Sequence, residues 1–141
     1  MIKVEAPRHL AHKPVYTIDN YNLRDGKNNP ETTDAQALTI GNSQWNENEI
    51  SAKVWRHTTG DESTGKWSRQ SEELPLHRLI DLNILLANVL ADLQGEKNVA
   101  EDVKLLNLNK RKVIKSFIED NKDILYPRLT ELRRLLNEIN L

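Results

Sequence analysis

The sequence of 141 residues contains no cysteine. Disulfide scaffolds, thiolate zinc sites and cysteine nucleophiles are therefore excluded. An excess of charge of one sign is also missing, because 20 Lys and Arg stand against 21 Asp and Glu, which gives a net charge of −1. This balance argues against bulk electrostatic binding to nucleic acids or to anionic membranes. Nucleic-acid binding, through the tryptophans and the basic residues 110–115, is therefore the weakest of the functions considered.

Long hydrophobic runs are absent as well. The most apolar stretch, residues 79–93, is interrupted by Asp81, Asn83, Asn88 and Asp92, whereas a spanning helix needs about 20 predominantly apolar residues. The first residues lack the apolar region and the small-residue cleavage site of a secretory signal. We therefore expect a cytoplasmic protein without a membrane segment.

The hydrophobic pattern divides one expected domain, residues 1–141, into three parts. Residues 1–34 are rich in Pro, Asn and Asp and predict an extended arm with one short strand. Residues 35–71 alternate apolar and polar side chains and predict an antiparallel meander, and residues 72–141 have the 3.6-residue period of helices. The expected fold class is α+β, a small antiparallel β-meander followed by three or four packed helices.

The expected strands and helices follow from the same periods. The strands are 15–18, 38–40, 50–57 and 66–69. Residues 72–93 are so apolar that they predict a central, buried helix, which Gly95 ends as a C-cap. A second helical region is expected over about 99–121, either continuous or broken near 107–109, and a last helix is expected with Pro127 in its first turn.

The last helix carries a heptad-like pattern. Its apolar residues are spaced four and three apart: Leu125, Leu129, Leu132, Leu136 and Ile139. This spacing fits packing against the central helix, and it also fits a homodimer formed through the C-terminal helices.

Polar side chains concentrate where the predicted strands lead into the central helix. The candidate ligand-binding residues of this junction are Arg56, His57, Arg69, Glu72, Glu73, His77, Arg78 and Asp81. His77 and Asp81 share a helix face, and Glu73 joins them if the helix begins before Pro75. Such a row is suited to a divalent metal or to acid/base chemistry, and the arginines are suited to an anion.

The same junction residues also fit a purely structural network, because acidic side chains favour the first turn of a helix. One helical row supplies too few ligands to fix a metal by itself. We therefore expect no metal site and no cofactor, and we assign no catalytic residue.

Three further groups have simple structural interpretations. His9 and His12 lie in the arm without a third ligand and are expected to be surface histidines. The tryptophans are expected to be buried against the central helix. The basic run 110–112, continued by Lys115, is expected to be a solvated helix face.

Two strings are specific, SAKVWR at 51–56 and WSRQSEE at 67–73. Through these two strings the sequence resembles a family of small uncharacterised bacterial proteins, which is known only as a domain of unknown function. Residues 12–15 and 19–21 are similar to the N-terminal pattern of that family, so the likeness covers about 10–86. The resemblance implies a bacterial, cytoplasmic protein and transfers no activity or cofactor.

Taken with the missing catalytic constellation, the sequence favours a non-catalytic binding or oligomerising protein. The alternative is a small metal- or anion-binding enzyme, hydrolase-like, with its site at the strand-to-helix junction.

Overall fold

The computed structural model describes residues 5–7, 9–25, 32–57, 67, 72–95 and 103–141. The chain contains two compact units, residues 1–83 and residues 84–141.

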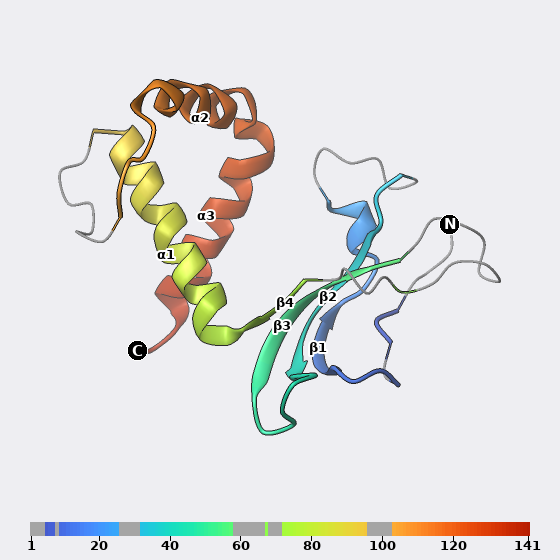
Figure 1. Ribbon diagram of the computed structural model, residues 1–141. Coiled ribbons are helices and arrows are strands. Elements are labelled where there is room, and N and C mark those ends of the chain that lie inside the picture. The colour runs from blue at the N-terminus through green and yellow to red at the C-terminus, as the bar shows by residue number, and fades with distance from the viewer. Residues whose placement is uncertain (1–4, 8, 26–31, 58–66, 68–71, 96–102) are drawn as a thin grey trace. The chain divides into compact units, whose positions relative to one another are not determined.

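The first unit is an antiparallel sheet in the order β1-β2-β3-β4 (Figure 1). Its strands are β1 (Lys13–Ile18), β2 (Ala35–Asn42), β3 (Ile50–Arg56) and β4 (Glu73–Pro75), with one short 3-10 helix, η1 (Tyr21–Leu23), between the first two. Each strand pairs with the next one along the chain, which makes the sheet a meander. The predicted α+β class is confirmed.

The strand β4 corrects the predicted start of the central helix at residue 72. Ser51, Ala52 and Lys53 of β3 pair with Pro75, Leu74 and Glu73, so this segment is extended and the helix begins only at Leu76. Of the predicted strand 66–69, only Trp67 lies within the described residues, where it forms an isolated antiparallel bridge with His57.

The core of the first unit lies on one face of this sheet. The side chains of β2 alternate, and Ala37 is fully buried opposite Trp55, which is 1% exposed. The small alanine leaves room for the indole ring, and Ala6 and Leu10 of the arm pack on the same cluster. The expected burial of Trp55 is confirmed, but the ring packs under the arm rather than against a central helix. Trp45 is 54% exposed, against expectation.

The helices are α1 (Leu76–Leu93), α2 (Leu108–Asp120) and α3 (Lys122–Glu138), as Figure 1 shows. The prediction of a buried central helix is wrong, because α1 has no buried residue. Ile84, Leu85 and Leu86 are 51%, 45% and 43% exposed. The apolar period identified a helix correctly, but periodicity alone does not say what covers it. None of the described helices is long and apolar enough to cross a membrane.

The helix ends differ from prediction in two places. Gly95 follows α1 with φ of 80°, as expected of a left-handed C-cap. However, residues 103–107 are not helical, so α2 begins at Leu108 rather than near residue 99. Pro127 lies inside α3 and not in its first turn, because α3 starts directly after Asn121.

Candidate functional site

Five side chains form a hydrogen-bonded chain on the buried face of the sheet. Trp55 Nε1 donates to Thr39 Oγ1 over 2.8 Å, and Thr39 Oγ1 lies 3.0 Å from His12 Nε2. On the other side of the imidazole, His12 Nδ1 lies 3.0 Å from Ser51 Oγ, which donates to Glu73 Oε2 over 2.9 Å. This series of hydrogen bonds links the arm to β2, β3 and β4.

The Glu73 carboxylate fixes the direction of the hydrogen bonds on its side of the imidazole. The Glu73 carboxylate can only accept, so the Ser51 hydroxyl donates to it and accepts from His12 Nδ1–H. Thr39 Oγ1 accepts from the Trp55 indole, and when the imidazole is neutral with its hydrogen on Nδ1, Thr39 donates to His12 Nε2.

Burial agrees with the neutral form of His12. Loss of hydration lowers the pKa of His12 below 6.5, the nearby Glu73 carboxylate raises it, and the Lys53 ammonium lowers it further. The net pKa is lowered, so the imidazole is uncharged at neutral pH.

Glu73 is the acidic end of the chain and is only 1% exposed. Its Oε2 accepts from Ser51 and from the main-chain N–H of Gln44 over 3.0 Å. Its Oε1 is buried and forms no hydrogen bond within the described residues. Lys53 Nζ lies 3.6 Å from this oxygen and 4.0 Å from the centre of the Trp55 ring, so the charge of Glu73 is partly offset.

This arrangement superficially matches a nucleophilic site, because a serine hydroxyl contacts an imidazole. Both His12 and Ser51 are 0% exposed, however, so neither can contact a substrate in this conformation. The Ser51 hydroxyl also points its hydrogen at Glu73 and not at the imidazole. The network is therefore suited to fixing the arm on the sheet and not to attack on a substrate. The expectation that His12 is a surface histidine is wrong.

Arg56, one of the three arginines of the predicted junction, is already paired with two carboxylates. Arg56 Nε donates to both oxygens of Glu72 at 3.1 and 3.0 Å, and Arg56 Nη1 donates to Asp34 Oδ1 at 2.8 Å. These hydrogen bonds lower the pKa of Glu72 and raise that of Arg56. A guanidinium held in this way offers little to an external anion.

The predicted row of Glu73, His77 and Asp81 does not form, because Glu73 belongs to β4 and faces the buried network. His77, Arg78 and Asp81 are exposed on α1, and in the described part of the chain His77 and Asp81 are not hydrogen-bonded to each other. The His57 ring packs edge-on against Trp67 at 4.9 Å. Arg69 lies outside the described residues. Among the described residues no three His, Asp or Glu side chains are grouped to hold a metal.

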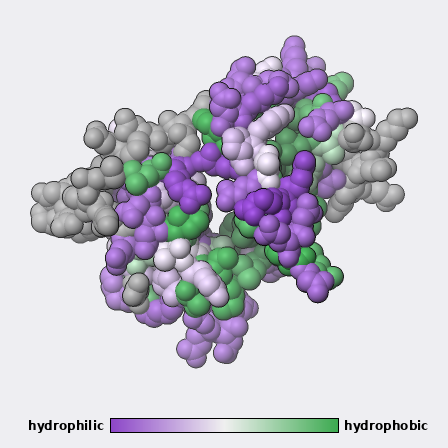
Figure 2. Space-filling model, turned by 180° about the vertical axis from the view of Figure 1, so that it is seen from behind, coloured by the Kyte–Doolittle hydropathy of each residue, from purple (hydrophilic) through white to green (hydrophobic). Residues whose placement is uncertain are grey.

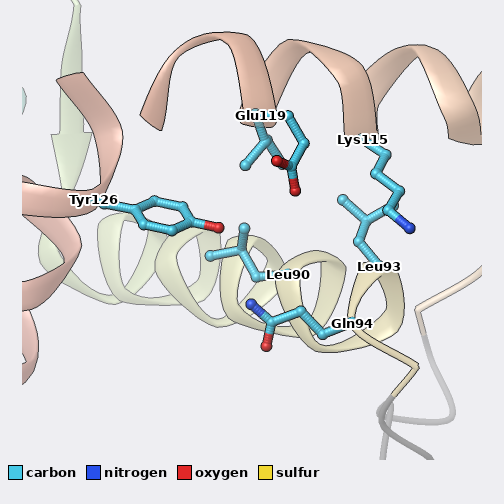
Figure 3. Close-up of a pocket in the computed structure, with 7 residues that line it drawn as sticks. Leu90, Leu93, Gln94, Lys115, Glu119 and Tyr126 are labelled. Atoms are coloured by element: carbon cyan, nitrogen blue, oxygen red, sulfur yellow. The ribbon is translucent and has the colours of Figure 1, made fainter. Parts of the chain in front are cut away.

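The second unit contains a pocket of about 310 Å³ where its three helices meet (Figure 3). It is lined by Leu90, Leu93, Gln94, Lys115, Ile118, Glu119 and Tyr126. Sequence patterns did not identify it, because it combines the end of α1 with faces of α2 and α3 that are far apart in the chain. For Lys115 the sequence predicts only a place on a solvated helix face.

Residues 4–99 match a family of unknown function, DUF6530. The chain belongs to this family. The match confirms the resemblance to a domain of unknown function and extends it on both sides of residues 10–86. It includes all four strands and α1, and it ends before α2. No curated protein and no solved structure matches the chain.

Proposed function

We propose that the protein is a non-catalytic, self-associating protein in which a second copy of the chain covers the apolar surface of the helical unit. The observation that carries this proposal is the exposure of α1, an apolar helix without one buried residue. Soluble monomers rarely expose large contiguous apolar patches, and such patches usually mark interfaces.

The other two helices have the same property. Neither α2 nor α3 has a buried residue. In the C-terminal half of α3, Leu132, Leu135 and Leu136 are 38–51% exposed, and Ile139 directly after the helix is 53% exposed. Green apolar surface also interrupts the polar surface in Figure 2. A small helical unit gains too little from burial to be stable with its apolar side chains in water, so we infer that they pack against a partner.

Three features favour a second copy as that partner. From Leu82 to Ala91 the helix α1 carries no charged residue, so two copies can meet across a two-fold axis without like-charge repulsion. Asn83 and Asn88 in this stretch donate to the carbonyls of Leu79 and Ile84 over 2.9 and 2.8 Å. Their side-chain amides are thus bonded within the helix.

The third feature is the spacing of the apolar residues on α3, which alternate four and three apart. This spacing suits packing of one helix along another. Between Glu131 and Glu138 the charges also cancel, with two Arg and two Glu, so the surface does not repel a copy of itself.

The alternative, a hydrolase-like enzyme at the strand-to-helix junction, receives no comparable support. Its acidic residue Glu73 is buried, its guanidinium Arg56 is paired, and His77 is exposed on α1. The bacterial and cytoplasmic setting remains a prediction from the sequence.

The test is the molar mass of the Leu136→Glu variant, measured by light scattering after size-exclusion chromatography. A glutamate at this 51% exposed position should be tolerated by the monomer but not by an apolar interface. We expect a dimer for the wild type and a monomer for the variant. Asn137→Glu, which adds the same charge at the next exposed residue of α3, should remain dimeric.

Helical content by circular dichroism distinguishes dissociation from unfolding. A wild type that is monomeric would overturn the proposal. The proposal would also be overturned if the Leu136→Glu variant on α3 and the Leu86→Glu variant on α1 were both fully helical and still dimeric.

A further inference from the structure

We propose that the pocket between α1, α2 and α3 binds a small organic carboxylate with an apolar body. Its volume of about 310 Å³ lies at the lower end of the range for ligand pockets. In Figure 3, Lys115 and Glu119 extend from α2 toward Leu90 and Leu93 of α1, and the Tyr126 hydroxyl points the same way.

Polar contacts of Arg111 and Asn121 lie next to the pocket. At one end, Arg111 of α2 donates to the Asp92 carboxylate over 3.0 Å and to its main-chain carbonyl over 2.6 Å. At the other end, Asn121 is 6% exposed between α2 and α3 and donates to the Phe117 carbonyl over 2.7 Å. The Arg111–Asp92 contact joins α1 to α2 beside the pocket, and the Asn121 contact caps the end of α2.

The charges at the pocket favour an anion. Glu119, the acidic lining residue, is paired with Lys122 over 2.7 Å, and this hydrogen bond raises the pKa of Lys122. Lys115, in contrast, has no hydrogen-bond or ion-pair partner in the described part of the chain. The helix α2 carries four basic and two acidic residues, a net charge of 4 − 2 = +2, so its field also attracts an anion.

The remaining lining residues define the rest of the ligand. The Gln94 amide and the Tyr126 hydroxyl also line the pocket and can donate hydrogen bonds to a ligand. Leu90, Leu93 and Ile118 form the apolar part of the wall. A ligand whose carboxylate binds Lys115 and whose aliphatic chain packs on the leucines would match the polar and the apolar parts of the wall. This role for the basic residues of α2 is independent of self-association, because neither Leu136 nor Leu86 lines the pocket.

The test is titration of the full chain with octanoate, followed by calorimetry and by amide shifts in NMR spectra. We expect saturable binding that shifts residues of the pocket and that weakens at least tenfold in Lys115→Gln. The matched control is Lys112→Gln, which removes the same charge from α2 outside this pocket and should bind octanoate as the wild type does. Octylamine, with the same chain and opposite charge, should not bind measurably.

Three results would overturn the proposal. They are no saturable binding of octanoate, equal binding of octylamine, or equal losses in Lys115→Gln and Lys112→Gln. The last result would mean diffuse attraction to α2 instead of a site. Repeating the titration on the Leu136→Glu variant separates the two proposals, because a monomer that binds octanoate retains the pocket without the dimer.

Discussion

Replacing His12 with alanine tests whether the buried hydrogen-bonded chain holds the arm on the sheet. The imidazole is 0% exposed and hydrogen-bonded on both nitrogens, to Thr39 and to Ser51. It also meets the Trp55 ring edge-on, with 5.7 Å between the ring centres. Alanine removes all of these contacts at once.

The loss can be worked out from these contacts. Two neutral hydrogen bonds contribute about 0.5–1.5 kcal/mol each, and the Thr39 hydroxyl, left buried without the His12 acceptor, adds about 1–3 kcal/mol. The cavity left by the ring adds a further cost, as in other large-to-small substitutions. We expect the free energy of unfolding to fall by about 3–5 kcal/mol.

The assay is urea unfolding followed by tryptophan fluorescence. The 3 tryptophans all lie in the first unit, so the signal reports on the sheet. His9→Ala is the control, because His9 is an exposed residue of the same arm and its loss should change the free energy by less than about 0.5 kcal/mol. A loss below about 1 kcal/mol for His12→Ala, or equal losses for both variants, would refute the reasoning.

Two more predictions concern the sheet. Because burial lowers the pKa of His12 despite Glu73, the unfolded chain takes up a proton first, so stability should fall as pH drops below about 6.5. Urea midpoints at pH 7.5, 6.5 and 5.5 check this, and an unchanged slope in His12→Gln would contradict it. Gly41→Ala places a Cβ 1.9 Å from a main-chain oxygen of β1 and should cost about 3 kcal/mol or more by thermal unfolding. The control is Gly95→Ala, where an added Cβ meets no described atom within 4 Å but the φ of +80° is strained, so we expect a cost of about 1–2 kcal/mol. A smaller loss for Gly41→Ala than for Gly95→Ala would contradict this prediction.

The regular elements were accessible from the sequence because their periods are local. Alternation located β2 and β3, and the 3.6-residue period located α1 and the last helix. The strand β4 has three residues, too few to show alternation, and its pairing with β3 decides its conformation. That pairing moves Glu73 from the expected helix face to the buried side of the sheet.

The buried network depends on contacts that no local pattern contains. His12 reaches Ser51 across 39 positions and Thr39 across 27, from an arm without a regular period. The alternation of β3 puts Ser51 and Trp55 on one face, and this is the local pattern in the sequence that bears on the network. For α1 the apolar pattern predicts the helix correctly, but it does not encode whether another surface covers the helix, so the predicted burial is wrong.

The most direct test of self-association is sedimentation equilibrium of the wild-type chain over a hundredfold range of concentration. The chain has a mass of 16.3 kDa, so the account predicts a species of 2 × 16.3 = 32.6 kDa that dissociates on dilution. A single species of 16.3 kDa at every concentration would contradict it.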